Sequence, residues 1–325
     1  MSARVVVVGS FNQDHVWFTP TLPDHGETCS GRYSIGPGGK GFNQAVAAAR
    51  SGAKTVFICA LGQDDAATQA RLLANAIGLD LRDESHAGLP TGSAGIFVDH
   101  GGGNMIVVAP GANAALSIDW VQQQHEVLSS AQVVLAQLEI PCPAAERALR
   151  VGREAGALTL LNPAPADAAT TLELLACADV LIPNESEFSA LLDRHSDLVL
   201  HADTVSRQSD DELHALCQGL AKATWVITLG ARGAFVSHAD RRWRGDVLAH
   251  YRVGAATARS IDTTGAGDAF SGALAAALAR APEQTFADTL LYATRFAALS
   301  TERAGAALVM PTSADVARRF GPRAR

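Results

Sequence analysis

Residues 262–279 read Asp262-Thr-Thr-Gly265-Ala-Gly267-Asp268-Ala-Phe-Ser-Gly-Ala-Leu-Ala-Ala-Ala-Leu-Ala279. A turn with two glycines leads directly into an apolar stretch, and this pattern predicts a buried helix that begins at the turn. The first turn of a helix has unpaired N–H groups and a partial positive charge, and glycines let a ligand approach the backbone closely. The stretch therefore predicts an anion-binding site at the backbone of Gly265, Ala266 and Gly267.

Asp268 lies in the first turn of this predicted helix, and its carboxylate has two interpretations. It caps the helix, as acidic residues in first turns commonly do. Alternatively, it accepts a proton beside the anion site, and the two features together are what phosphoryl transfer requires. The stretch by itself leaves both interpretations open.

The composition is that of a globular protein with a large core, in one domain or two. Of the 325 residues, 48% are hydrophobic and 18% are charged, which argues against intrinsic disorder. The net charge of −7 lacks the basic footprint of a nucleic-acid-binding protein. The apolar run near the N-terminus is too short for a signal peptide, and no apolar stretch approaches the length of a membrane span.

The number and spacing of the cysteines indicate the redox environment of the protein. There are five, an odd number without a CxxC pair, which favours a reducing environment over a zinc site or a disulfide framework. We therefore expect a cytoplasmic protein that binds neither nucleic acid nor membrane.

Buried strands and helices alternate along the chain. Val5–Val8 is a continuous β-branched run, the pattern of a strand that is buried on both faces. Similar strands are expected at Thr55–Ala60, Val133–Leu138, Leu158–Leu161, Val180–Ile182 and Trp225–Thr228, and helices at Gly41–Ser51, Ala66–Ala76, Ala144–Ala155, Leu172–Ala176 and Asp211–Lys222. The alternation predicts an α/β fold, a three-layer α/β/α sandwich with helices on both faces of a mostly parallel central sheet.

Two segments interrupt this alternation. Residues 15–35 have the pattern of short exposed strands, and residues 92–109 that of a hairpin with a glycine-rich turn. We expect them to form a small β-sheet lid. The predicted division assigns residues 1–10, 37–90 and 111–325 to the α/β domain that binds nucleotide and substrate, and residues 11–36 and 91–110 to the lid. Because lid strands have exposed edges, we also expect two lids to pair in a homodimer.

Polar residues follow the predicted strands where the strands end. They are Asn12, Asp14, Glu139, Asn162, Asn184 and Glu187. Each by itself suits a turn or a cap, but ligands of open α/β sheets bind beyond the carboxyl ends of the strands. Their shared position predicts one ligand-binding rim.

A second glycine-rich segment, Gly36-Pro37-Gly38-Gly39-Lys40-Gly41-Phe42-Asn43, precedes a predicted helix. It contains a G-x-G-x-x-G match, which in a dinucleotide site would make Asp64 or Asp65 the ribose-binding acid. However, the strand before it is short and polar, and the spacing differs from that of a P-loop. We favour a sugar site in which backbone N–H groups and Asn43 bind hydroxyls beside the charge of Lys40; a plain turn is the alternative.

The two glycine segments resemble the two signature regions of the PfkB, or ribokinase-like, carbohydrate kinases. The resemblance rests on Gly38-Gly39-Lys40-Gly41-x-Asn43 and on Asp262-Thr-Thr-Gly-Ala-Gly-Asp268, and it covers nearly the whole chain. Further matches in order and spacing are Gly9-Ser-x-Asn12-x-Asp14, Gly26-Glu27-Thr28, Asn43-Gln-Ala-Val-Ala-Ala, Pro110-Gly-Ala-Asn113-Ala, Asn162-Pro-Ala-Pro-Ala, Pro183-Asn184-Glu-x-Glu187 and Thr228-Leu-Gly-x-Arg-Gly233.

The resemblance implies ATP-dependent phosphorylation of a primary hydroxyl of a sugar, with the 5-hydroxyl of D-ribose as the expected acceptor. It makes Asp268 the base and the amides of Gly265, Ala266 and Gly267 the anion hole. The residues that it implies for sugar binding are Asn12, Asp14, Gly38, Gly39, Lys40, Asn43, Glu139 and Asp268. Those that it implies for the nucleotide are Asn184, Glu187, Thr228, Gly230, Arg232, Gly233, Gly267 and Thr294, with Glu187 acting on Mg²⁺ through water.

The resemblance also implies a monovalent cation, normally K⁺, beside the anion hole. Its implied ligands are Asp262, Thr264, Ser300, Arg303, Gly305 and Val309. Three positions depart from the family pattern: Val309 stands where a serine is common, Phe42 where an alanine is usual, and Thr294 where a His or Asn is common. The change at 309 removes a hydroxyl ligand, and the other two lie where the sugar and the adenine are expected.

Three alternatives remain open. A kinase of another sugar or of a nucleoside would have the same motifs, a non-catalytic sugar-binding protein would keep the fold, and an NAD-dependent oxidoreductase would use the glycine match at 36–41. The intact Asp268 and Gly265–Gly267 argue against the non-catalytic protein.

Overall fold

The computed structural model describes residues 4–240 and 243–321, so the ends of the predicted α/β domain, residues 1–3 and 322–325, lie outside it. Within these ranges the main sheet has nine strands in the order β13-β12-β11-β10-β9-β8-β1-β4-β5. Their bounds are β1 Arg4–Val8, β4 Lys54–Gly62, β5 Asp80–His86, β8 Val133–Gln137, β9 Leu158–Asn162, β10 Val180–Leu181, β11 Thr224–Thr228, β12 Ala234–Ser237 and β13 His250–Val253. Neighbouring strands are parallel from β5 to β11, and β12 and β13 pair antiparallel at one edge.

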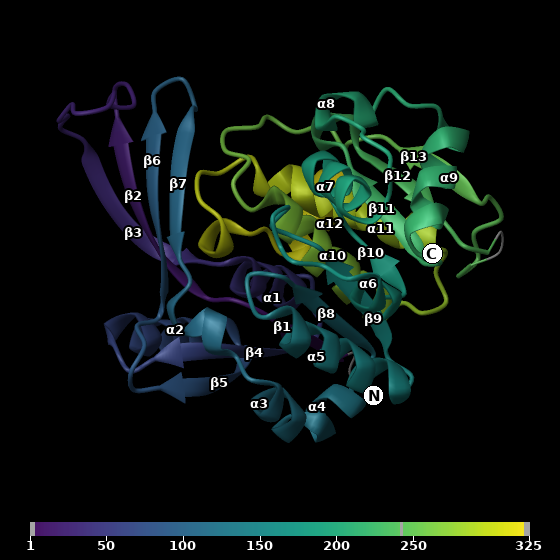
Figure 1. Ribbon diagram of the computed structural model, residues 1–325, viewed down its shortest axis with the longest axis horizontal. Helices are drawn as coiled ribbons and strands as arrows, with labels where there is room; N and C mark the ends of the chain where they lie inside the picture. Colours follow the sequence, from purple (N-terminus) through teal and green to yellow (C-terminus); the bar gives the residue numbers. More distant parts are fainter. Residues whose placement is uncertain (1–3, 241–242, 322–325) are drawn as a thin grey trace.

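Helices cover both faces of this sheet (Figure 1). One face packs on α1 Lys40–Arg50, α2 Asp65–Ile77, α10 Ala266–Arg280, α11 Phe286–Ser300 and α12 Ser313–Phe320. The other packs on α3 Ile118–Gln123, α4 His125–Ser129, α5 Cys142–Glu154, α6 Leu172–Ala176, α7 Glu185–His195, α8 Ala202–Val205 and α9 Asp210–Leu220. Short 3-10 turns lie at η1 Gly111–Ala115, η2 Gly230–Arg232 and η3 Ala307–Val309. The three-layer sandwich expected from the sequence is thus confirmed.

The continuous apolar runs form the centre of the sheet, as expected. Val5, Val6, Val7 and Val8 are wholly buried, and alternate residues face the two helical layers. Burial of such side chains on both faces stabilises the fold by roughly 1.5–3 kcal/mol for each side chain. β5 at one end of the sheet and β12 and β13 at the other were not predicted; in β5, polar residues interrupt the apolar pattern, since it reads DLRDESH.

A second sheet has the strand order β3-β2-β6-β7 and stands apart from the main body (Figure 1). Its strands are β2 Asn12–Thr19, β3 Arg32–Gly38, β6 Gly92–Asp99 and β7 Asn104–Ala109, and we call it the lid sheet. β2 and β6 pair in parallel, whereas the other two pairs are antiparallel. The expected exposed strands and hairpin therefore form one sheet, and β3 runs two residues past the predicted lid boundary at 36.

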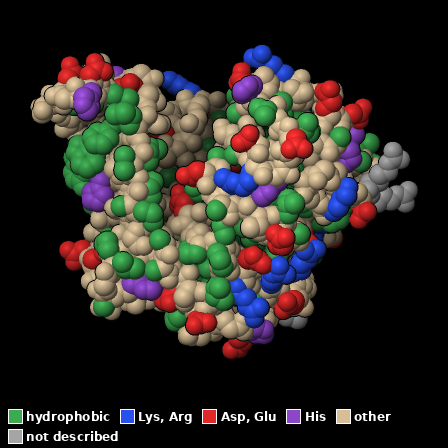
Figure 2. Space-filling view, viewed as in Figure 1, with side chains coloured by type: hydrophobic (Ala, Val, Ile, Leu, Met, Phe, Trp, Pro, Cys, Tyr) green, Lys and Arg blue, Asp and Glu red, His purple; other side chains and the backbone are tan. Residues whose placement is uncertain are grey.

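Figure 2 shows the surface hollowed between the lid sheet and the main body, with hydrophobic side chains gathered on the lid sheet. All six residues of β7 are exposed, and Tyr33 and Ile35 of β3 are exposed as well. Among the described residues, no helix combines the length and the apolar character needed to cross a lipid bilayer.

Candidate functional site

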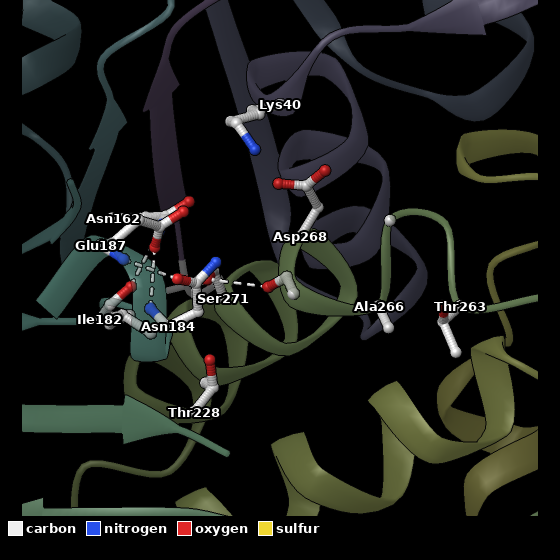
Figure 3. Close-up of a pocket in the computed structure, with 12 residues that line it drawn as sticks. Lys40, Asn162, Ile182, Asn184, Glu187, Thr228, Thr263, Ala266, Asp268 and Ser271 are labelled. Carbon is white, nitrogen blue, oxygen red and sulfur yellow. Dashed lines mark hydrogen bonds between the residues drawn. The ribbon is translucent and has the colours of Figure 1, made fainter. Parts of the chain in front are cut away.

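A cavity of about 180 Å³ lies where strand ends meet three helix N-termini (Figure 3). It is bounded by the ends of β9 and β11, by the segment after β10, and by the first turns of α1, α7 and α10. Its volume is below the roughly 300–1,000 Å³ of pockets that enclose a drug-sized ligand, so it suits a small polar group. The lining residues are Lys40, Asn162, Ile182, Asn184, Glu187, Thr228, Thr263, Gly265, Ala266, Gly267, Asp268 and Ser271.

The N-terminus of α10 opens into this cavity. Its N-cap, Gly265, has φ +72° and no side-chain cap bond, and a Cβ there would lie 3.0 Å from the Cβ of Ala306. A Cβ on Gly267 would meet no atom within 4 Å, so the space beside that residue is open. The N–H group of Ala266 donates to Thr263 O at 3.1 Å, which leaves the N–H groups of Gly265 and Gly267 free of backbone acceptors among the described residues. These groups give the cavity wall the character of an anion site.

The carboxylate of Asp268 is buried at the head of α10 and does not cap the helix. Its Oδ2 accepts a hydrogen bond from Asn43 Nδ2 and its Oδ1 accepts one from Gln44 Nε2, both at 3.0 Å. Burial raises the pKa of Asp268 above its ordinary value, although the charge of Lys40 and the two amide hydrogen bonds oppose this rise. The structure therefore decides against the capping interpretation.

Lys40 begins α1, opposite Asp268, and Figure 3 shows its ammonium group directed toward that carboxylate. Burial lowers the pKa of Lys40, but the charges of Asp268, Glu139 and Glu187 outweigh it and raise the pKa above its ordinary value. The backbone N–H of Lys40 donates to Glu139 Oε2 at 3.0 Å, and Ser10 Oγ donates to the same oxygen at 2.5 Å. Lys40 is thus a half-buried cation among carboxylates.

Asp14 and Asn12 lie at the base of the lid sheet, next to the start of α1. Burial and the nearby charges of Glu139 and Asp268 raise the pKa of Asp14 to about 7. A Cβ on Gly38 would lie 2.0 Å from Asp14 Oδ2, so a side chain at this position would displace the carboxylate of Asp14. Asn12 Oδ1 accepts a hydrogen bond from Asn113 Nδ2 at 2.8 Å. Gly39 follows with φ +87°, and a Cβ there would lie 2.8 Å from the backbone nitrogen of Asn12.

Asn184 and Glu187 form a capping box at the start of α7. Asn184 Oδ1 accepts from the backbone N–H of Glu187, and Glu187 Oε2 accepts from that of Asn184, both at 2.8 Å. Burial raises the pKa of Glu187, against the hydrogen bond from Asn184 and the charge of Lys40. Both residues line the cavity, as the predicted rim requires.

The other residues expected at the nucleotide are less closely grouped. Thr228 lines the cavity, whereas Gly230, Arg232, Gly233 and Thr294 do not. Arg232 pairs with Glu185 at 2.8 Å, and Gly233 has φ +90° where a Cβ would lie 1.9 Å from Val253 O. Thr294 is buried within α11, and its hydroxyl donates to Leu290 O at 3.0 Å.

The residues expected at the monovalent cation occupy two adjoining segments. Asp262 Oδ1 accepts from the N–H of Thr264 and its Oδ2 from that of Gly305, both at 2.9 Å. These donors hold the pKa of Asp262 below its ordinary value, although burial raises it. A Cβ on Gly305 would lie 3.7 Å from the Val309 side chain, and Ser300 Oγ donates to Ala297 O at 2.7 Å. Arg303 and Val309 line a neighbouring surface hollow.

Sequence reasoning missed several polar groups of the site. Asn162 was placed on the rim without a role, yet its amide bonds to Ile182 O and Gln44. Ser10, Gln44, Asn113 and Ser271 were not selected. Ser10 and Asn113 lie within quoted motifs, which was a usable signal. Gln44 also lies within a quoted motif, Asn43-Gln-Ala-Val-Ala-Ala, although a glutamine inside a helix gives no indication that it is buried.

The comparisons with known proteins agree with this geometry. A family model described as pfkB family carbohydrate kinase matches residues 2–313. Ribokinase of Haemophilus influenzae is 35% identical, covering 96% of this chain and 96% of its own; ribokinase of Mus musculus is 36% identical, covering 97% and 94%. The structure of Arabidopsis thaliana ribokinase complexed with ribose and ATP is similar with a TM-score of 0.82 at 29% identity, covering 98% of both chains. This chain belongs to the PfkB family of carbohydrate kinases.

Proposed function

We propose that this protein is an ATP-dependent sugar kinase that converts D-ribose to D-ribose 5-phosphate. The observation that carries the proposal is the position of Asp268, a buried carboxylate between the open N-terminus of α10 and the cation of Lys40. An anion site, a proton acceptor and a fixed positive charge around one small cavity are what transfer of a phosphoryl group to an alcohol needs.

In the proposed reaction the primary hydroxyl oxygen of the sugar forms a bond to the γ-phosphorus of ATP. The bond from that phosphorus to the bridging oxygen breaks, and ADP leaves with its electron pair. The hydroxyl proton passes to Asp268. The N–H groups at Gly265 and Gly267 and the charge of Lys40 stabilise the oxygens of the transferring group.

Asn12, Asp14, Gly39, Lys40, Asn43 and Glu139 would hold the sugar. An ionised carboxylate accepts hydrogen bonds and donates none, which suits a ligand that offers several hydroxyls. The lid sheet would close over the sugar before ATP binds, so that water does not take the phosphoryl group. The adenosine part would lie outside the small cavity, along Thr228, Gly230, Arg232 and Gly233, with Thr294 nearby.

The donor set fits the two cations that the family implies. Glu187 with Asn162 and Asn184 presents hard oxygen donors to the cavity, which suit Mg²⁺ held through water. Asp262 accepts hydrogen bonds from two backbone N–H groups. The residues that would offer K⁺ mainly backbone carbonyls are Thr264, which is close to Asp262 in sequence, and Ser300, Arg303, Gly305 and Val309 of the 300–309 segment. When bound, the cations neutralise the phosphate charge.

The lid sheet would also join two copies of the chain. β7 pairs with β6 on one side, and the side chains of Met105, Ile106, Val107 and Val108 are exposed, Val107 to 71%. Such an edge favours pairing with a second copy. Light scattering should give twice the chain mass of 33.8 kDa, and Val107→Lys should lower it. A monomeric wild-type protein would contradict the dimer.

A substrate panel tests the proposed activity. ATP consumption should be highest with D-ribose among D-ribose, 2-deoxy-D-ribose, D-fructose and adenosine, and the product should carry the phosphate on the 5-oxygen. Asp268→Asn keeps the shape of the side chain but cannot take a proton, so we expect kcat to fall roughly 10²–10⁴-fold while sugar binding persists. Turnover that is unchanged in this variant would contradict the assignment of the base.

A further inference from the structure

Gln44 contacts the base from the protein interior. It follows Asn43 in α1 and is wholly buried. Its Nε2 donates to Asp268 Oδ1 at 3.0 Å and to Asn162 Oδ1 at 3.0 Å, so both of its N–H bonds are used. Asn162 Nδ2 in turn donates to Ile182 O at 2.8 Å and lies 3.5 Å from Glu187 Oε2. One chain of amides therefore joins Asp268 to the Glu187 side of the cavity.

The backbone around Gln44 fixes this contact. α1 and α10 approach so closely that a Cβ on Gly272 would lie 2.2 Å from the carbonyl oxygen of Gln44 and 2.7 Å from the Cβ of Ala47. Gly272 is one turn after Asp268, on the same side of α10. The close approach therefore holds the amide of Gln44 and the carboxylate of Asp268 in register without help from a ligand.

The arrangement has a cost, which indicates that it serves the site. Gln44 Oε1 is buried without a hydrogen-bond partner among the described residues, and so are Asn43 Oδ1 and both amide atoms of Gln137. A buried polar atom of this kind costs about 1–3 kcal/mol. An apolar side chain of the same length at position 44 would avoid that cost.

We propose that Gln44 is a positioning residue for Asp268, an inference that rests on the proposed kinase function. It holds Oδ1 from the interior and leaves Oδ2, the oxygen beside Asn43, to take the proton from the acceptor hydroxyl. It also favours the ionised carboxylate, because a hydrogen bond donated to a charged acceptor stabilises the charge.

The charged groups that face Asp268 come from four elements. They are Lys40 of α1, Asp14 of β2, Glu139 after β8 and Glu187 of α7. Lys40 favours the ionised form of Asp268, and the three carboxylates oppose it. Removal of the Gln44 donor leaves all four in place, so a change in the pH profile reports the lost hydrogen bond.

Gln44→Met tests the proposal, since methionine has a similar length and no donor. We expect kcat to fall about 10-fold or more, as for loss of a hydrogen bond to a charged group. In the pH profile of kcat, the acidic limb should move to higher pH by about one unit. The KM for the sugar should change less than twofold, because Gln44 does not reach the sugar side of the carboxylate. Gln137→Met is the matched control: it is equally buried but has no bond to Asp268, and it should keep the wild-type limb.

A second variant covers the case in which Gln44→Met does not fold. Gln44→Glu keeps the shape but sets a second carboxyl group against Asp268, and the pair should share one proton. Its acidic limb should then shift upward further than that of Gln44→Met. A wild-type limb in a folded Gln44 variant would overturn the positioning role while the Asp268→Asn result still stands for the kinase; turnover in Asp268→Asn would instead overturn the kinase assignment.

Discussion

Of the three helices that begin at the wall of the cavity, α7 and α10 have N-termini that are satisfied in opposite ways. α7 begins with a capping box, in which the side chains of Asn184 and Glu187 accept from each other's backbone N–H groups. α10 begins at Gly265, in a left-handed conformation and without a side-chain cap. α2, α9, α11 and α12, which lie elsewhere, all have side-chain caps. α1, α4, α5 and α8 also lack a side-chain cap, so the contrast drawn here is the one between α7 and α10 at this cavity.

The difference separates the tasks of the two helices. The N–H groups of Asn184 and Glu187 at the start of α7 have side-chain acceptors, so this terminus offers a carboxylate to the cavity rather than an anion site. The N–H groups at the head of α10 face open space beside Gly267, and they remain available to phosphate oxygens. An anion should therefore bind at α10, and a change of charge there should have a far larger effect than the loss of a cap at α7.

Gly267→Asp is expected to produce the largest effect. A Cβ at this position would meet nothing within 4 Å, so the fold should tolerate a side chain there. An acidic residue in the first turn of a helix stabilises the helix by about 0.3–1 kcal/mol. The new carboxylate would occupy the anion site and repel ATP. We expect kcat/KM for ATP to fall about 10³-fold, with Tm unchanged or slightly higher.

Ala314→Asp provides the control, because it adds the same charge at the same position of the capped helix α12, where Ala314 is exposed. Its kinetic constants should match those of the wild type. If Gly267→Asp kept wild-type affinity for ATP, the open terminus of α10 would not be the phosphate site.

Asp14→Asn tests a second contrast, between two carboxylates whose pKa values are shifted in opposite directions. Asp262 has two backbone donors and a lowered pKa, whereas burial beside Glu139 and Asp268 raises the pKa of Asp14 to about 7. The folded state thus holds a proton on Asp14 that the unfolded chain releases near the ordinary aspartate pKa of 3.8. Stability falls as the pH rises between these two values, and the loss is complete above about pH 7.

The variant should therefore be more stable than the wild type by up to about 4 kcal/mol at pH 8, since one pKa unit corresponds to 1.36 kcal/mol. The gain should vanish below about pH 4, and the KM for the sugar should rise. Urea unfolding at pH 4, 6 and 8 measures this trend. A gain that is the same at all three pH values would show that the charge of Asp14 is not its cause.

The sequence predicted the parts of the molecule whose residue pattern is local. The continuous apolar runs identified β1, β4, β8, β9 and β11, and the glycine motifs identified the starts of α1 and α10. Edge strands such as β5 were not predicted from the sequence, because their polar residues follow no hydrophobic periodicity. At the site, Asp268 and Lys40 were found from their motifs, whereas Gln44 acts through a contact between residues more than 200 positions apart. Such a contact exists only after α1 packs on α10.

The smallest effect is expected from Asn184→Ala, which removes the cap of α7. Loss of an N-cap costs about 1 kcal/mol of stability. Ser209→Ala removes an equivalent capping box from α9, away from the cavity, and should cost about the same. Only Asn184→Ala should also lower kcat, because it removes the acceptor of the Glu187 backbone N–H and so loosens the first turn that presents the Glu187 carboxylate to the cavity. We expect a decrease of a few-fold for Asn184→Ala and none for Ser209→Ala, measured beside the unfolding free energy of each. Equal kinetic constants in the two variants would mean that the capping box of α7 stabilises its helix without orienting Glu187 for the reaction.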